Sequence, residues 1–372
     1  MKKIFVFCIL LLTITGCKKE TLKQYRMISF ESGFDTFFTL VGYANSQEEF
    51  TEYFELLEET ALHYHRLFDK YHAYEGINNI YTINQNAGIQ PVKVDVEIIN
   101  LLLLAKNWYN ITNGLFDITF GSVLNVWHSY RESGTDLNNM GEYGEIPPFS
   151  SLEEAAQFTG WDFVEIDIDA QTVYITDARV SFDVGAIAKG YAVEKIALVL
   201  EETGLQYASI SGGGNVRTIN YKPDYAPWNI SVKQPDSIVN QSLDILAIPH
   251  SCSAVTSGDY ERYYIIEGNI LLHHIIDPRT LMPTQNARSV TIVYSDSGVA
   301  DILSTVLMIL DFEEGVAFVN QYNAEHPDEQ IGVLWVFMES QGQQKGYREI
   351  QKDGFTLYIT ENILELSTLF GE

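Results

Sequence analysis

The chain contains, at residues 181–194, the stretch SFDVGAIAKGYAVE, which places an acid, several small residues, a lysine and a glycine around the start of a predicted helix. The first turn of a helix presents backbone N–H groups without intrahelical partners and the positive end of the helix dipole. Both features suit a phosphate group. Lys189 adds a mobile positive charge beside them. The stretch therefore indicates a ligand that carries phosphate.

The rest of the chain is strongly acidic. It has 372 residues, a formal net charge of −27 and a hydrophobic content of 46%. The apolar content predicts a true core, and the length suffices for one large domain or two. Such an acidic surface repels nucleic acid and anionic membranes, so neither is an expected partner. A phosphate must then be held by a local cluster of cations or by a metal.

The N-terminus has the pattern of an export signal. Lys2 and Lys3 precede an apolar run at residues 4–14, which is too short to span a bilayer as a helix. The run ends in ITGC at residues 14–17, which resembles a bacterial lipobox. We expect a lipoprotein signal peptide at 1–16, a lipidated Cys17, and an extracytoplasmic protein anchored to a bacterial cell membrane. An ordinary secretory signal with a chance cysteine is the alternative.

Beyond the signal, residues 17–32 are predicted to be a polar tether, and residues 33–372 the folded domain. Cys252 is the single cysteine of that domain, so no disulfide within it is possible, and we expect this residue to serve packing.

Hydrophobic periodicity predicts an α+β fold with antiparallel sheets and helices packed on them. The expected elements, in chain order, are a strand at 33–43, helices at 46–68 and 95–109, a long loop at 134–150, a hairpin at 163–176, a helix from the quoted stretch to about 202, strands between 207 and 294, helices at 299–310 and 313–322, and strands at 331–338 and 355–360.

Four further segments carry residues suited to a ligand site. The glycine-rich segment SGGGN at 211–215 allows close backbone approach to a ligand, or it is a hairpin turn. TSGDY at 256–260 is a second turn before a strand, and HHIIDPRT at 273–280 places a histidine at a strand end beside an Asp-Pro turn. In ADILST, Asp301 and Thr305 lie one helical turn apart. They suit Mg²⁺ facing a phosphate, or Asp301 is a helix cap.

Taken in order, these segments resemble the ApbE family, the FAD:protein FMN transferases. The matching motifs are Asp183 to Tyr191, Gly212 to Asn215, Thr256 to Tyr260, His274 to Thr280, Ala300 to Thr305 and Gly114 to Thr119, with an opening strand at 33–40. Several motifs in the right order are more specific than any one of them. The chain departs from the family at Leu281, where a glycine is usual after Asp-Pro-Arg-Thr.

The resemblance implies a fold with two T-fold-like halves and a role for individual residues. The implied Mg²⁺ ligands are Asp301, Thr305 and the carbonyl of Ala186. The implied FAD contacts are Phe34, Tyr71, Leu115, Phe116, Asp117, Asp183, Lys189, Gly213, Gly214 and Ile275. His274 matches a histidine near the reacting phosphate, and either His274 or Asp301 is the general base.

The implied reaction is Mg²⁺-dependent transfer of FMN from FAD to a threonine hydroxyl of an acceptor protein, with release of AMP. The acceptor expected from the resemblance is an FMN-binding domain or a redox-pump subunit outside the cytoplasm. Two alternatives stay open. One is a Mg²⁺-dependent FAD pyrophosphatase that gives FMN and AMP, and the other is a lipoprotein that binds flavin without catalysis.

Overall fold

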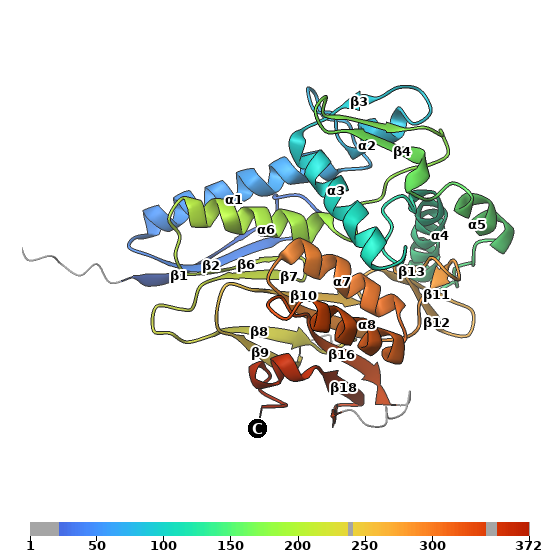
Figure 1. Ribbon diagram of the computed structural model, residues 1–372. Helices are drawn as coiled ribbons and strands as arrows, with labels where there is room; N and C mark the ends of the chain where they lie inside the picture. The colour runs from blue at the N-terminus through green and yellow to red at the C-terminus, as the bar shows by residue number, and fades with distance from the viewer. Residues whose placement is uncertain (1–21, 237–240, 340–347, 372) are drawn as a thin grey trace, which may run out of the picture.

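The structure, a computed structural model, describes residues 22–236, 241–339 and 348–371. Its centre is a nine-stranded sheet in the order β1-β2-β6-β7-β10-β15-β16-β18-β17, with every neighbouring pair antiparallel (Figure 1). The strands are β1 (Lys23–Ser29), β2 (Phe38–Ala44), β6 (Ala208–Gly212), β7 (Asn215–Ile219), β10 (Ser253–Gly258), β15 (Ser289–Tyr294), β16 (Gly332–Met338), β17 (Glu349–Lys352) and β18 (Phe355–Ile359). The prediction of an α+β fold with antiparallel sheets is confirmed.

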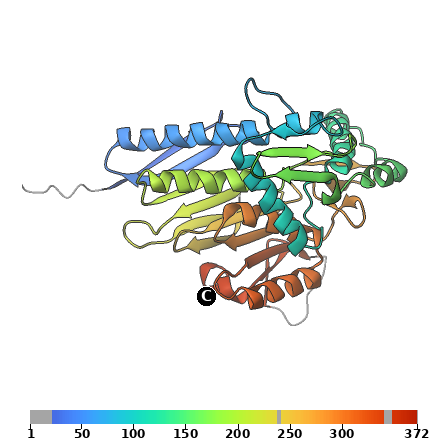
Figure 2. The same cartoon turned by 45° about the horizontal axis from the view of Figure 1, so that its top comes forward.

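Four helices cover one face of this sheet (Figures 1 and 2). They are α1 (Gln47–Phe68), α6 (Ala188–Glu202), α7 (Ser297–Ile309) and α8 (Phe312–Glu325). Helices α1 and α6 share a hydrophobic core with β2 and β6, and α7 packs in a second core against β15 and β16. The opposite face of β16 and β18 is covered by the hairpin β8 (Trp228–Lys233) and β9 (Ser242–Ile248) together with residues 361–370.

The remaining elements lie outside the large sheet (Figure 1). They are α2 (Ile80–Gln85), β3 (Val92–Lys93), α3 (Val96–Ile111), α4 (Gly121–Asn139), α5 (Phe149–Ala156), β4 (Val164–Asp167), β5 (Thr172–Ile175), β11 (Tyr263–Ile266), β12 (Ile270–His273), β13 (Ile276–Asp277) and β14 (Met282–Pro283). The predicted hairpin at 163–176 is the pair β4–β5. No helix in the described ranges is long and apolar enough to cross a membrane.

Local capping explains why the long helices begin where the sequence predicts. Ser46 accepts a hydrogen bond from the backbone N–H of Glu49 at the start of α1, and Asp95 accepts one from Glu97 at the start of α3. Helix α7 is capped by Asp296, whose side chain accepts a hydrogen bond from Val299. Asp301 lies more than one turn inside α7, so the cap alternative for Asp301 is wrong.

Three predictions about chain segments are wrong in part. The tether predicted at 17–32 overlaps β1, a polar edge strand whose backbone pairs with β2 in the main sheet. The loop predicted at 134–150 contains the last turns of α4 and the start of α5. Residues 33–37 are a turn, so the first predicted strand begins only at Phe38. The signal peptide and Cys17 lie outside the described residues.

Candidate functional site

A cleft of about 870 Å³ opens where the start of α6, the middle of α7 and the turns at the strand ends meet. This volume lies within the usual range of small-molecule sites. All the predicted site residues in the described part of the chain line it: Phe34, Tyr71, Leu115, Phe116, Asp117, Asp183, Ala186, Lys189, Gly213, Gly214, His274, Ile275, Asp301 and Thr305. The fold therefore brings residues from separate motifs into one place.

Asp301 joins α7 to the start of α6. Its side chain is buried, and Oδ2 accepts a hydrogen bond of 2.9 Å from the backbone N–H of Gly190. Helix α6 begins at Ala188, later than the quoted stretch predicts, and its first ladder bond runs from Tyr191 to the carbonyl of Ile187. Gly190 is thus an orphan donor of the first turn, and Asp301 satisfies it from another helix.

The close approach of these two helices requires a glycine. A Cβ placed on Gly190 would lie 2.2 Å from the carbonyl oxygen of Ser297 and 2.6 Å from Cβ of Asp301. By contrast, a Cβ on Gly185 would meet only the carboxylate of Asp183, at 3.1 Å. Gly190 is therefore the glycine of the quoted stretch that sets the geometry of the site.

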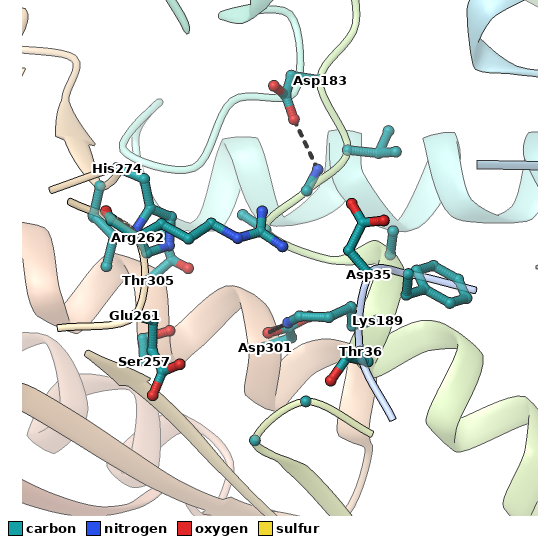
Figure 3. Close-up of a pocket in the computed structure, with 18 of the residues that line it drawn as sticks. Asp35, Thr36, Asp183, Lys189, Ser257, Glu261, Arg262, His274, Asp301 and Thr305 are labelled. Carbon is teal, nitrogen blue, oxygen red and sulfur yellow. Dashed lines mark hydrogen bonds and ion pairs between the residues drawn. The ribbon is translucent and has the colours of Figure 1, made fainter. Parts of the chain in front are cut away.

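Lys189 lies on the cleft side of this junction. Its Nζ donates to Oδ1 of Asn215 at 3.2 Å and lies 3.7 Å from Oδ1 of Asp301 (Figure 3). Asn215 opens β7, just after the glycine turn that joins β6 to β7. Gly213 and Gly214 in this turn have φ of +54° and +91°, so the SGGGN segment is both a hairpin turn and a wall of the cleft.

The donors beside Lys189 fit a hard cation. Oδ1 of Asp301 accepts no hydrogen bond from any described residue, and the Ala186 carbonyl is left out of the backbone ladder of α6. Thr305 lines the same cleft one turn after Asp301 (Figure 3). The described residues contain no group of three His, Cys, Asp or Glu side chains that could hold a metal. One carboxylate, one hydroxyl and one carbonyl oxygen suit Mg²⁺, which is usually bound through one or two carboxylates and keeps water or phosphate ligands.

Two serines stiffen this corner. Oγ of Ser304 donates to the carbonyl of Asp301 at 2.9 Å and lies 2.7 Å from Oγ of Ser257. Because a hydroxyl has one proton, Ser257 is the donor in the second bond. The oxygen of Ser257, which lines the cleft, can therefore only accept from or ligate what enters it.

Asp183 is held by a lysine that sequence reasoning missed. Nζ of Lys70 lies 2.7 Å from Oδ2 of Asp183, and Oδ1 accepts from the N–H of Gly185 at 2.9 Å. Burial raises the pKa of this carboxyl, but the charge of Lys70 and these hydrogen bonds outweigh burial and lower it. Asp183 is therefore ionised. A basic residue directly before Tyr71 was the available signal.

His274 presents one ring nitrogen as a proton acceptor. Its Nδ1 lies 3.3 Å from the carbonyl oxygen of Arg262, which can only accept, so Nδ1 carries the proton and Nε2 is free of it. Burial, followed by the charges of His273, Arg262 and Arg131, lowers the pKa of His274 to about 3. The imidazole is neutral at pH 7.

The opposite wall is shaped by aromatic and acidic groups. The backbone N–H of Phe34, a residue with φ of +58°, donates to Nδ1 of His65 at 3.1 Å. Oδ1 of Asp117 accepts from the N–H and the hydroxyl of Thr119, at 2.8 and 2.7 Å. Burial raises the pKa of Asp117 although these bonds oppose it. Its second oxygen accepts no hydrogen bond from residues 22–236, 241–339 or 348–371 and can accept one from a ligand.

Comparison with known proteins decides the family. Residues 34–327 match the model of the ApbE family. The chain belongs to the ApbE family.

Its relatives agree over most of their length. The FAD:protein FMN transferase of Vibrio cholerae is 27% identical over 321 residues, which are 86% of this chain and 87% of that protein. The enzyme of the same name from Klebsiella pneumoniae is 30% identical over 246 residues, 66% of this chain and 72% of that protein. The chain is therefore an enzyme of the transferase class.

Solved structures of the family share the fold. The ApbE protein of Thermotoga maritima matches with a TM-score of 0.73 and 27% identity, over 94% of this chain and 100% of that one. The apo flavinyl transferase ApbE of Pseudomonas stutzeri matches with a TM-score of 0.72 at 21% identity, over 94% and 98% of the two chains, which shows the fold alone.

Leu281, the departure from the ApbE pattern, has a backbone conformation that favours glycine. Leu281 has φ of +62°, in the left-handed region that a glycine adopts without strain. Its carbonyl accepts a 2.8 Å hydrogen bond from Nε1 of Trp127 on α4. The side chain of Leu281 packs against a local core.

Proposed function

We propose that this ApbE-family protein transfers FMN from FAD to a threonine hydroxyl of an acceptor protein, with Mg²⁺ as cofactor and AMP as the second product. The family and the names of its relatives support the flavin-transferase class. The observation that carries the finer proposal is the junction of Asp301, Lys189 and the Ala186 carbonyl with His274 in one cleft. This arrangement combines cation-binding oxygens, a fixed positive charge and a proton acceptor.

The reaction balances without any further reactant. The threonine oxygen forms a bond to the FMN-side phosphorus of FAD, and the bond from that phosphorus to the bridging oxygen breaks. The bridging oxygen leaves with the electron pair as part of AMP, and the threonine proton passes to a base. No group is oxidised or reduced.

His274 fits the role of that base better than Asp301. Nε2 of His274 is unprotonated and lies beside the cleft, whereas Asp301 already holds the N–H of Gly190 and lies near Lys189. A poor nucleophile such as threonine needs a base within hydrogen-bond reach. A neutral imidazole accepts the proton without first losing one. With a pKa of about 3 it is a weak base, and the negative charge of a bound diphosphate would raise that pKa.

Lys189 and Asp301 would prepare the diphosphate. The Lys189 ammonium is positioned by Asn215 and offers a fixed charge to the non-bridging oxygens. When bound by Asp301, Thr305 and the Ala186 carbonyl, Mg²⁺ would neutralise part of the charge on these oxygens. The flavin nucleotide would be held against the walls of the cleft, which are formed by Phe34, Tyr71, Leu115, Phe116, Ile275 and the glycine turn.

The location outside the cytoplasm is part of the proposal. The basic start, the apolar run at 4–14 and Cys17 support export and lipid anchoring. Labelling cells with a radioactive fatty acid tests it, since the wild-type chain should carry the label and Cys17→Ser should not. A labelled Cys17→Ser chain would contradict the lipobox.

The test of the activity is the intact mass of an acceptor domain carrying one candidate threonine, incubated with the protein, FAD and Mg²⁺. The acceptor should gain the mass of FMN less one water, and Asp301→Asn and His274→Gln should each slow this gain at least about a hundredfold. The matched controls Asp136→Asn and His250→Gln change exposed residues outside the cleft and should match the wild type.

The other outcomes distinguish the alternatives. Free FMN and AMP with an unlabelled acceptor would indicate an FAD pyrophosphatase. Bound FAD that is never turned over, unaffected by Asp301→Asn, would indicate a protein that only binds flavin. Either result, with a verified acceptor, would refute the transferase proposal.

A further inference from the structure

The cleft is lined by five lysine and arginine side chains, and three of them already have carboxylate partners. Lys70 lies 2.7 Å from Asp183, Lys189 lies 3.7 Å from Asp301, and Lys233 lies 3.4 Å from Glu261. Arg131 and Arg262 complete the set. No carboxylate of the described chain lies within ion-pair distance of either guanidinium.

The absence of acidic partners is notable for Arg131 in particular. Its side chain is partly buried, and its Nη2 donates to Nδ1 of His128 at 2.7 Å. An arginine can only donate, so this contact requires a neutral His128, which brings no opposite charge to Arg131. The negative charges of Asp183 and Glu132 act on Arg131 only from beyond ion-pair distance. The chain has 50 acidic and 23 basic residues and a net charge of −27, so carboxylates are far more numerous than cations. The site nevertheless keeps its positive charge.

The structure holds the two arginines together by a rigid contact between distant segments. Arg131 lies on α4, and Arg262 directly precedes β11. The amide of Asn138, one of the last residues of α4, bonds to the N–H and the carbonyl of Ile265 at 2.6 and 2.8 Å. Gly134 lets Tyr264 approach so closely that a Cβ there would lie 2.3 Å from its ring. The end of α4, which the sequence predicted to be part of a loop, thus holds the helix that carries Arg131 against the segment that carries Arg262.

Both charges act at His274. Figure 3 shows Arg262 beside His274 and pointing into the cleft, with Lys189 and Asp301 in another part of it. Arg262 and Arg131 each contribute, after burial, to the lowered pKa of His274. Arg262 also contributes, after burial, to a lowered pKa of Arg131. Two positive charges therefore act on the proposed base, and neither has a carboxylate within ion-pair distance among the described residues.

We propose that Arg131 and Arg262 form an anion site for the phosphate of the departing AMP. The choice of AMP rests on the proposed function: when the bridging oxygen leaves, the adenylate phosphate gains one negative charge. Lys189 and the cation-binding oxygens serve the phosphate that is transferred. The fork of N–H groups on a guanidinium matches phosphate oxygens in pairs, and its charge persists at any working pH. Donors placed where charge develops stabilise the transition state most.

The experiment measures binding without turnover. Dissociation constants of AMP, adenosine, FMN and riboflavin are determined by calorimetry for the wild type, Arg131→Met, Arg262→Met and the double variant. The wild type should bind AMP more tightly than adenosine. Each single variant should reduce this ratio by about tenfold, the usual scale of a charged hydrogen bond, and the double variant should abolish it. The preference for FMN over riboflavin should remain in all of them.

The controls separate a specific site from general charge. Arg26→Met removes one exposed cation on β1, outside the cleft, and should leave every ratio unchanged. Arg262→Lys keeps the charge without the fork and should retain part of the AMP preference. Melting temperatures close to that of the wild type show that the variants are folded.

Two results would overturn the inference. One is an unchanged ratio of AMP to adenosine in the double variant, and the other is a loss that falls on FMN over riboflavin alone. Neither depends on acceptor labelling, so failure of this proposal is distinct from failure of the transferase proposal.

Discussion

The contact between Gly190 and α7 yields a prediction with a definite sign. Gly190→Ala would place a methyl group 2.2 Å from the carbonyl oxygen of Ser297, whereas ordinary contacts begin near 3.4 Å. Because backbone lies on both sides, the helices must separate by about 1 Å, as an overpacked core does. The 2.9 Å bond from Gly190 to Asp301 would then exceed hydrogen-bond length.

The magnitude follows from three contributions. Overpacking costs about 1–3 kcal/mol. Loss of a hydrogen bond to a buried carboxylate costs about 1.5–3 kcal/mol. Replacing a helical glycine by alanine returns up to about 1 kcal/mol. We expect Gly190→Ala to lower the free energy of unfolding by about 2–4 kcal/mol and to displace Asp301, so that flavin transfer also falls.

The assay is urea unfolding at pH 7, followed by tryptophan fluorescence, with Gly315→Ala as the matched control. Gly315 also lies within a helix, α8, but a Cβ there would lie 3.4 Å from Leu307, an ordinary contact. This variant should be neutral or stabilised by up to about 1 kcal/mol. If the two variants were equally stable, the reasoning about the junction of α6 and α7 would be refuted.

Three further predictions concern buried polar groups. The variant Asp301→Asn keeps an oxygen that can accept the hydrogen bond from Gly190. Its free energy of unfolding in urea should therefore stay within about 1 kcal/mol of the wild type, while FMN labelling of the acceptor protein is lost. Loss of both stability and labelling would indicate a structural role for Asp301. Burial lowers the pKa of His273 to about 4, so below pH 6.5 the unfolded chain binds a proton that the folded chain does not. His273 therefore contributes a loss of about 2 kcal/mol from pH 7 to 5, which should be missing in His273→Gln while the similar contribution of His274 remains. An unchanged slope of stability against pH in that variant would contradict the prediction. Arg217 and Glu194 form a buried ion pair with 2.9 Å between the charged groups. We expect Arg217→Met to lower the free energy of unfolding by about 3–5 kcal/mol, and the second change Glu194→Gln to restore part of that loss. An Arg217→Met variant as stable as the wild type would argue against this reasoning.

Local patterns in the sequence were enough for the elements that begin with a cap and carry a periodic apolar face. Ser46 and Asp95 start α1 and α3 as predicted, because side-chain caps act on N–H groups two or three residues away. The buried thiol of Cys252 also agrees with its predicted packing role, since burial raises its pKa to about 11. Local sequence propensity did not predict the two segments whose structure depends on tertiary contacts. Polar β1 is held by pairing with β2, and the end of α4 is held by Asn138 against β11.

The sequence by itself determined which chemical groups the site contains, because the ordered motifs include its acidic, lysine, histidine and glycine residues. Only the tertiary structure decided which of them meet. Asp301 bonds Gly190 across 111 positions, and Lys70 pairs with Asp183 across 113. The same holds for Arg131 and Arg262, which have no carboxylate within ion-pair distance in the part of the chain that the structure describes. Hydrogen bonds and charges act over a few ångströms of space, and a neighbour of that kind leaves no local trace in the chain.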